Sequence, residues 1–368
     1  MKIIAFALFA LPVVSGPPAH GASQGEQAGF GVQLELAGRF AYTETDEGIG
    51  QKFVLPRTRV SLMADDGQAI SGRFVLAAVR STPETGYLGV DGEALITRID
   101  AAEGRVHWRK LGLSLAAGVL SNPWIDRRND RWTWQAVQPT VAEAQGFMAR
   151  ADLGFELRWH RKDELISAWI QGHAGEGHRF RERNGGQSVI GVIRLRPLGF
   201  SNRAWARYVE VSLMGLEGSV GAASARNHRF GGRLAAGDET ITGGVEWIKA
   251  LGQNGDPVPE PWALSVWAET NPWRALIGYA RFDLVELSPH FEETHRHTFD
   301  VGIGVQMPYE AARPDRQGRL SLGYRLARAD EQATPVAGAA GQESTHMVFA
   351  QLTLDFGLTF SMPPENLK

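Results

Sequence analysis

The chain has 368 residues, a formal net charge of −3 and no cysteine. The lack of cysteine excludes disulfides and thiolate metal sites, and so mild a charge gives no indication of a nucleic-acid partner. Of the 38 cations 32 are arginine, and glycine (43) and tryptophan (11) are abundant.

The first 22 residues have the features of a secretory signal peptide. Lys2 precedes an apolar run from Ile3 to Val14, and small residues surround Gly21 and Ala22, where cleavage would fall. The run is too short to cross a bilayer as a helix. We therefore expect residues 1–22 to be removed during export, and residues 23–368 to form one domain.

The rest of the chain alternates apolar and polar residues with a period of two, which predicts β-strands with two unlike faces. The stretch Val348 to Phe360, VFAQLTLDFGLTF, is apolar at every second position. Sixteen segments are expected as strands: 30–44, 53–65, 69–80, 95–109, 112–120, 147–160, 163–174, 188–197, 205–214, 220–235, 239–251, 261–270, 273–285, 298–307, 318–328 and 345–360. Glycines interrupt the alternation in the ninth and tenth segments, so a barrel of fourteen strands is an open alternative.

The predicted connections alternate between long and short. The long ones are 81–94, 121–146, 175–187, 252–260, 286–297 and 329–344. The short ones include ADDGQ, KL, PLGFSNR, AGDE and TNP, while PYEAARPDRQ is longer than its place in this order predicts. Long loops at one end and short turns at the other are typical of an outer-membrane β-barrel.

A soluble β-sandwich is the competing interpretation, because it also alternates. Several predicted strands reach the ~9–11 residues that cross a bilayer at a tilt. Aromatic residues also gather near strand ends, as they do at the two membrane interfaces of barrels: Phe30, Tyr42, Trp108, Trp159, Trp262, Trp273 and Phe360. The predicted fold is therefore all-β, a transmembrane antiparallel β-barrel of about 16 strands with short periplasmic turns and long extracellular loops.

The polar phase of the strands predicts which side chains line the inside of the barrel. The expected lining residues are Arg39, Arg57, Arg59, Arg73, Arg105, His107, Arg109, Arg150, Arg158, Arg194 and Arg196, with Arg229, Arg233, Arg319 and Arg325 in the same phase. Inward acids are fewer: Glu35, Glu103, Asp152, Glu156, Glu210, Asp300 and Asp355. An excess of fixed cations would favour anions in confined water. Alternatively, arginines and acids pair on neighbouring strands and only stabilise the wall.

The loop 121–146 is the long segment that could enter the interior. Its charged residues lie beside Trp124, Trp132 and Trp134; they are Asp126, Arg127, Arg128, Asp130 and Arg131. The loop either folds inward and forms a constriction carrying both signs of charge, or lies outside with its tryptophans packed on the barrel mouth.

The stretch Asp100 to Trp124, DAAEGRVHWRKLGLSLAAGVLSNPW, and the segment LPRTRVSL resemble the phosphate-selective porin (O and P) family. The resemblance implies a sixteen-stranded, trimeric outer-membrane porin whose third long loop folds inward. The chain departs from the family in having only six lysines and in carrying SMPPENLK beyond its terminal aromatic residue. The first departure bears on phosphate specificity, and the second on the usual C-terminal assembly signal.

We therefore expect a Gram-negative outer-membrane porin that passes small anionic or neutral solutes by diffusion and contacts outer-membrane lipid and lipopolysaccharide. The resemblance implies a homotrimer, but the residues themselves leave trimer and monomer as open alternatives, because interface side chains look like lipid-facing ones. No nucleic acid, cofactor or metal is expected, and no enzymatic activity. The segment HFEETHRH could bind a divalent cation, although surface histidines explain it as well. The alternative function is a closed, non-conducting barrel with a structural or adhesion role through its extracellular loops.

Overall fold

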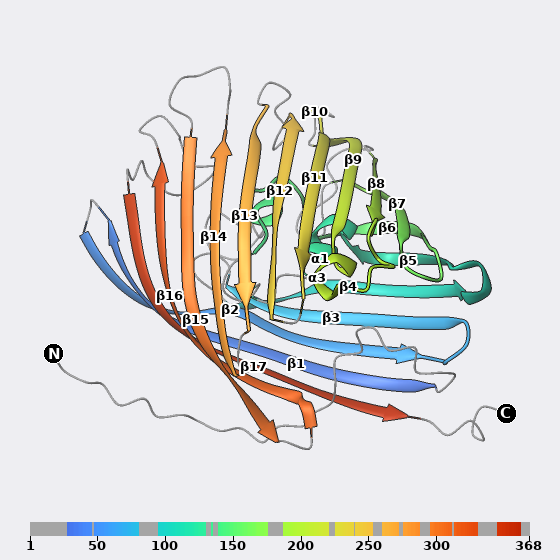
Figure 1. Ribbon diagram of the computed structural model, residues 1–368, viewed down its shortest axis with the longest axis horizontal. Coiled ribbons are helices and arrows are strands. Elements are labelled where there is room, and N and C mark those ends of the chain that lie inside the picture. Colours follow the sequence, from blue (N-terminus) through green and yellow to red (C-terminus); the bar gives the residue numbers. More distant parts are fainter. Residues whose placement is uncertain are drawn as a thin grey trace.

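The computed structural model describes residues 28–45, 48–80, 95–129, 134, 139–175, 187–220, 225–238, 240–252, 260–271, 275–287, 295–310, 313–329 and 344–361. The predicted signal peptide lies outside this part of the chain. The described residues form one antiparallel sheet that curves into a barrel, with two short helices inside it and a third at one end (Figure 1).

The strands follow one another in chain order. They are β1 (Gly29–Thr45), β2 (Gly48–Asp65), β3 (Ile70–Arg80), β4 (Leu95–Trp108), β5 (Leu113–Ser121), β6 (Ala151–His160), β7 (Ile166–His173), β8 (Ser188–Leu195), β9 (Glu210–Val220), β10 (Ala225–Arg226), β11 (His228–Gly237), β12 (Ile241–Leu251), β13 (Trp262–Thr270), β14 (Leu276–Glu286), β15 (His295–Glu310), β16 (Arg313–Ala329) and β17 (Ser344–Ser361). The helices are the 3₁₀ turn η2 (Arg109–Leu111), α1 (Pro123–Asn129), α2 (Val141–Ala144) and α3 (Ala204–Arg207).

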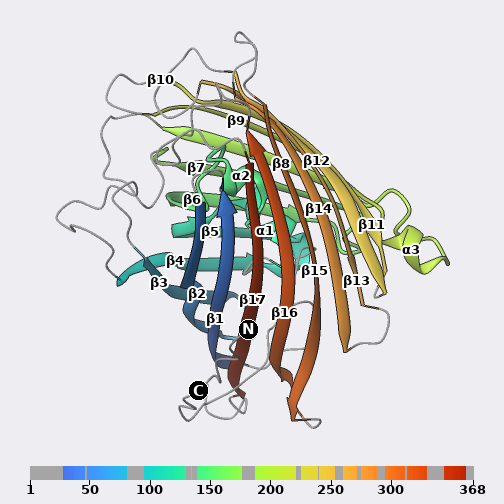
Figure 2. The ribbon, with the colours of Figure 1, turned by 90° about the vertical axis from the view of Figure 1, so that its left-hand side faces the viewer.

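The barrel is closed by its first and last strands. β1 pairs with β17 from Gly29↔Ser361 to Thr45↔Thr345, and on its other side it pairs with β2. Figure 2 shows β1 and β17 side by side. Closure leaves no unpaired sheet edge, which a barrel in hydrocarbon requires because lipid offers no hydrogen-bond partners.

The wall contains sixteen strands, as the sequence predicted. β10 and β11 are two parts of one strand, because both pair with β9 in a continuous register and are separated only by Asn227. The ninth and tenth strands, however, are displaced from their predicted ranges. The segment expected to begin β9 forms α3 instead, and β9 continues through the glycine-containing stretch to Val220.

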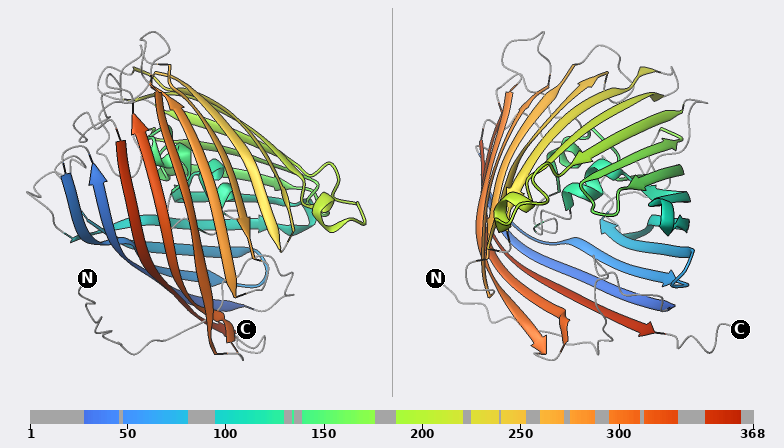
Figure 3. Two further views of the ribbon diagram at one scale, coloured as in Figure 1. Left: turned by 60° about the vertical axis from the view of Figure 1, so that its left-hand side comes forward. Right: turned by 45° about the vertical axis from the view of Figure 1, so that its right-hand side comes forward.

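The two ends of the barrel differ in their connections, as the sequence also predicted. Figure 3 shows α3 at the end of the barrel that carries the short turns. The segment PYEAARPDRQ, expected as a connection, is mostly strand: β15 and β16 run through it and leave only 311–312 between them. Among the described residues, no helix is long and apolar enough to span a membrane.

Two of the short turns are held by an aspartate. Asp66 accepts hydrogen bonds from the backbone N–H groups of Gln68, Ala69 and Ile70 at 2.8, 2.8 and 2.9 Å. Asp238 accepts from Ile241 and Thr240 at 3.0 and 2.8 Å. Backbone donors favour the ionised form, so the bonds from Ile70 and Ile241, followed by the others, lower the pKa of the Asp66 and Asp238 carboxyls.

The two faces of the wall follow the predicted phases. Leu153, Phe155 and Leu157 of β6 are exposed on the outside, whereas Asp152 and Glu156 between them are buried on the inside. The closing strand follows the same rule, because Val348 is exposed while Gln351 is fully buried. An apolar outer wall and a polar inner wall are the arrangement that a membrane barrel requires.

Candidate pore constriction

The loop between β5 and β6 begins with a capped helix. The Oδ1 atom of Asn122 accepts the backbone N–H of Trp124 at 3.0 Å, and this bond starts α1. At α2, the Thr140 hydroxyl accepts from the backbone N–H of Glu143 at 3.3 Å. The spacing Thr-x-x-Glu is that of a capping box. Local sequence therefore fixes two short helices in the described part of this loop.

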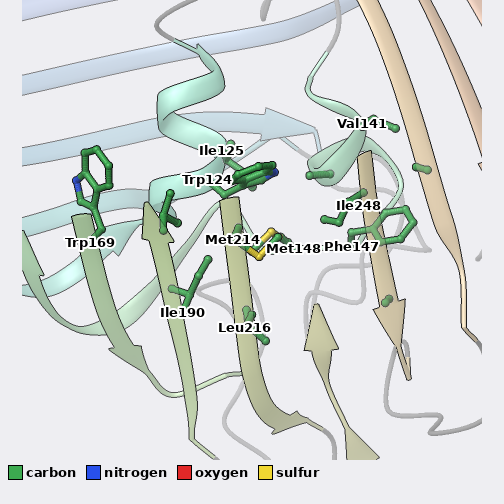
Figure 4. Close-up of a cluster of buried hydrophobic side chains, with 14 of the residues drawn as sticks. Trp124, Ile125, Val141, Phe147, Met148, Trp169, Ile190, Met214, Leu216 and Ile248 are labelled. Atoms are coloured by element: carbon green, nitrogen blue, oxygen red, sulfur yellow. The ribbon is translucent and has the colours of Figure 1, made fainter. Parts of the chain in front are cut away.

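The described residues of the loop pack on the inside of the barrel, and their forming a constriction stays a prediction. Trp124 has no exposed surface and its indole Nε1 donates to Glu246 of β12 at 2.8 Å. Figure 4 shows this tryptophan among side chains of the loop and of the wall. The apolar cluster comprises Trp124, Ile125, Val141, Ala142, Phe147 and Met148 of the loop, and Trp169, Ile190, Val192, Met214, Leu216, Ile248, Ala250, Ala263 and Val285 of the wall.

Four inward arginines hold the loop by its carbonyl and amide oxygens. Arg233 donates to the Trp124 carbonyl at 2.9 Å and stacks on the Trp124 ring at 4.1 Å. Arg229 donates to the Phe147 carbonyl at 2.7 Å, and Arg281 donates to the Pro139 carbonyl. Arg296 reaches the side-chain oxygen of Gln145 at 3.4 Å. Arg229 and Arg233, which the polar phase assigned to the lining, therefore serve as loop supports.

The middle of the loop reaches further round the wall. Trp134 is fully buried, lies 4.3 Å from the Tyr279 ring of β14 and has the Arg319 guanidinium 4.7 Å from its centroid. Gly304 of β15 leaves room for this indole, since a Cβ at that position would lie 2.9 Å from it. The loop thus contacts the inner wall from β7 to β16.

The opposite part of the inner wall, from β2 to β6, is charged. Asp100 is shared by Arg59 and Arg98, each at 2.7 Å. Glu156 is likewise shared by Arg105 at 2.8 Å and Arg158 at 3.0 Å. Both carboxylates are buried, so their two arginines offset the cost of desolvating them.

A third shared acid, Glu210 of β9, contacts Arg194 at 3.7 Å and Arg196 at 3.4 Å. Further acids reach two of these clusters: Glu103 lies 3.5 Å from Arg105, and Glu164 lies 3.1 Å from Arg196. Many of the arginines predicted to line the interior are thus neutralised locally. At Asp100, two arginines contact one buried carboxylate.

One ion pair joins the inward loop to the charged wall in the part of the chain that the structure describes. Arg73 of β3 lies 3.9 Å from Asp126 of α1, and 36% of each side chain is exposed. Both side chains are more exposed than either partner in the ion pairs of Asp100 and Glu156. The gap between loop and wall is therefore narrow and hydrated at this point.

The remaining predicted residues lie in several different places. Arg39 donates to Gln351 at 2.8 Å and lies 4.7 Å from the Phe349 ring, while His107 hydrogen-bonds Ser71 at 2.8 Å. Arg109 and Arg150 differ from prediction, because neither lies on a strand. Arg109 is half exposed in η2 near Asp65, and Arg150 bonds Glu143 within the loop. These positions place Arg109 at the short-turn rim and make Arg150 a brace of the loop.

Some predicted residues cannot be placed. The side chains of Arg57, Arg127 and Arg128 lie outside the described part of the chain, as do Asp130 and Arg131 altogether. Of the HFEETHRH segment, only His295, Arg296 and His297 are described, and no group of metal-ligating side chains occurs among the described residues.

Inward acids that the sequence analysis missed complete the site. Asp100, Glu246 and Asp283 are all buried and bonded to arginines. Asp283 follows Arg281 at the spacing of one strand face, so the pattern RFD in β14 could have revealed that pair. Glu246 sits in VEWIKAL, where apolar residues on both faces hid its phase.

Comparisons with known proteins support the fold. No protein-family profile and no curated protein sequence matches the chain. Among solved structures, the anion-selective porin from Comamonas acidovorans aligns at 12% identity and TM-score 0.61, over 89% of this chain and 100% of that one. The DcaP channel of Acinetobacter baumannii aligns at 9% and 0.58, over 91% and 99%. OmpF of Salmonella typhi aligns at 11% and 0.61, over 89% and 97%. The chain therefore has the fold of porin barrels, and its resemblance to the phosphate-selective family stays a prediction.

Proposed function

We propose that the protein is an outer-membrane porin that passes small hydrophilic solutes by diffusion through a water-filled lumen. The observation that carries the proposal is the hydrated contact between Arg73 and Asp126, where the inward loop approaches the charged wall. Solutes would pass on this side, because the loop covers the opposite wall with an apolar cluster. Pore radius and fixed charge would determine which solutes pass, without a cofactor.

The proposed selectivity is a mild preference for anions. The partly exposed guanidinium of Arg73 lies on the side of the proposed path, and so do Arg59 and Arg98, which share the carboxylate of Asp100. Arginine keeps its proton when partly desolvated, so these charges persist in a narrow pore. The neutralised clusters around Glu156 and Glu210 limit the preference. The anion selectivity of the Comamonas acidovorans porin fits the same proposal.

The proposal includes the surroundings of the barrel. Lipid and lipopolysaccharide would contact the apolar outer wall, and the protein would lie in the outer membrane after removal of residues 1–22. A homotrimer is proposed as well, because one structural neighbour, OmpT of Vibrio cholerae, is described in a trimer form; that chain aligns at 12% identity and TM-score 0.55, over 89% of this chain and 99% of that one.

Conductance of the mature protein in planar bilayers tests the proposal. Wild-type protein should insert in discrete steps, and a salt gradient should give a reversal potential of anion-preferring sign. Arg73→Gln should move this potential toward cations and Asp126→Asn should move it toward anions, because each removes one charge at the gap. Arg203→Gln, at an exposed position in the β8–β9 turn, is the control and should leave it unchanged.

A second candidate function is a closed barrel that acts through its long loops. It is favoured by the burial of inward residues on β13 to β17, where Ser265, Asp300 and Gln351 have no exposed surface. A folded protein that inserts into bilayers and never conducts would support this candidate and contradict the porin.

A further inference from the structure

The connection between β8 and β9 is unlike the other turns at the same end of the barrel. It spans residues 196–209, whereas the turn between β2 and β3 spans 66–69 and that between β11 and β12 spans 238–240. It also contains a helical turn, α3. Figures 2 and 3 show α3 projecting beyond the rim of the wall. We call residues 197–208 the β8–β9 knob.

The knob has a fixed shape. At its base, the backbone N–H of Arg196 donates to the Leu165 carbonyl at 2.8 Å, and the Arg196 guanidinium contacts Glu164 and Glu210. Ala206 of α3 is buried, and its backbone N–H donates to the Arg203 carbonyl at 3.1 Å. These hydrogen bonds and ion pairs fix the backbone that carries the exposed apolar side chains of the knob.

The knob exposes large apolar and aromatic side chains together with two cations. Phe200 is 77% exposed and Trp205 is 51% exposed, and Leu198 and Tyr208 are exposed as well. Arg203 and Arg207 are also exposed, and the knob has no acidic residue. The neighbouring acids are occupied, since Glu164 contacts Arg196 and Asp163 contacts Arg161. A rigid, uncovered surface of this kind is costly in water.

We propose that the β8–β9 knob is an anchor that binds anionic phospholipid headgroups at the membrane surface on the short-turn side. Aromatic rings with a polar edge are enriched at the bilayer interface, and arginines near an anionic surface are attracted to it. The inference rests on the proposed function in one respect, namely that the barrel spans a membrane.

The neighbouring wall supports a lipid occupant over a protein partner. Leu195 and Leu213, which flank the knob on β8 and β9, are exposed on the outer face of the barrel. This lipid-facing surface is continuous with the knob. The rings and guanidinium groups therefore lie next to the apolar wall, as the headgroup region lies next to the hydrocarbon core of a bilayer. The knob contains two arginines and no acidic residue, so its positive charge is complementary to an anionic surface.

The chain has no cysteine, so single cysteines can report the surroundings of the knob. The full mature protein is reconstituted in vesicles of phosphatidylglycerol and phosphatidylcholine, and each cysteine carries a nitroxide. A label at Phe200→Cys should be reached by oxygen and shielded from an aqueous nickel chelate. Gln68→Cys, in the exposed β2–β3 turn, is the water control, and Leu213→Cys, on the outer wall, is the lipid control.

Each outcome of this experiment decides something. If Leu213→Cys is lipid-accessible while Phe200→Cys is as open to the chelate as Gln68→Cys, the anchor is wrong and the barrel stands. If Leu213→Cys itself is water-accessible, the membrane barrel fails, and with it the porin. Shielding of Phe200→Cys that occurs only in native outer membranes would indicate a protein partner and overturn the proposal.

The charge requirement has its own test. The nitroxide at Phe200→Cys should be more strongly shielded from the nickel chelate in anionic than in neutral vesicles. The double substitution Arg203→Gln and Arg207→Gln should reduce this preference by about fivefold for each arginine. Trp205→Phe, which keeps an aromatic ring, should retain most of the shielding. Equal shielding in purely zwitterionic vesicles, before and after the double substitution, would contradict the electrostatic part of the proposal.

Discussion

The inner wall of this barrel has two regions of opposite chemistry. The covered wall, on β7–β9 and β12–β14, presents apolar side chains such as Ile190, Leu216 and Ile248 to the inward loop. The charged wall, on β2–β6, presents Arg59, Arg73 and their carboxylate partners to the remaining space. From Val189 to Ile193, in the middle of β8, the residues of both faces are apolar, which fits a strand covered by lipid outside and by the loop inside.

The contrast shows how one loop can divide a wide barrel. Apolar residues inside a water-filled tube would be unfavourable, so their burial under the loop is what stabilises the loop in its inward position. Arg233 and Arg229 also fix the position of the loop, because they donate hydrogen bonds from the wall to carbonyl groups of the loop backbone. Where the wall is charged, the loop contacts it through the exposed ion pair of Arg73 and Asp126, and we expect water to fill the gap.

The largest expected effect comes from removing the central side chain of the covered wall. Trp124→Ala should lower the free energy of unfolding by about 3–5 kcal/mol, because a fully buried indole is replaced by a cavity and Glu246 loses a donor. Urea unfolding in detergent micelles measures this change. Release of the loop should also raise the single-channel conductance.

The matched control is Trp205→Ala, which removes an exposed indole and should change the free energy of unfolding by no more than about 0.5 kcal/mol in micelles. If both substitutions cost the same, or if Trp124→Ala leaves conductance unchanged, the covered wall does not hold the loop.

A smaller effect is expected from the buried charge beneath Trp124. Glu246 is fully buried and lies 3.5 Å from Arg233. Glu246→Gln keeps an acceptor for the indole but leaves Arg233 without this anionic partner, which should cost about 2 kcal/mol. Glu260→Gln is the control: Glu260 is partly exposed and pairs with Lys249, so its loss should cost less than about 1 kcal/mol. Equal losses would mean that burial does not set the strength of these pairs.

The sequence predicted the barrel well because closure and phase follow from a period of two. The strand ranges, the closing strand Val348 to Phe360 and the inward location of Asp152 and Glu156 needed only alternation. The wall division was not predicted, although VIGVI in β8 is apolar on both faces and could have indicated a covered wall. Which arginines are neutralised depends on cross-strand partners, and a register cannot be obtained from a single strand.

A third substitution tests whether the charged wall, rather than the covered wall, determines the ion selectivity. Arg59→Gln should lower stability by about 1 kcal/mol, because buried Asp100 loses the Arg59 guanidinium. It should also shift the reversal potential toward cations. Arg194→Gln removes one of two arginines at Glu210 beside the ring of Trp169, in the covered wall, so it should cost similar stability with little change in selectivity. Equal shifts for both variants would contradict a path confined to the charged wall.

The smallest effect is expected outside both walls, in the turns that Asp66 and Asp238 hold. The lowered pKa of each carboxyl means that the ionised form stabilises the fold above the unfolded value of about 3.9, and that this contribution is lost as pH falls through the folded value. Asp66→Asn, at the charged wall, and Asp238→Asn, at the covered wall, should each lower stability at neutral pH, with the difference from wild type vanishing in strong acid. Because turn chemistry does not depend on the wall above it, the two variants should behave alike. A difference that persists at low pH would show that packing, rather than the carboxylate charge, holds the turn.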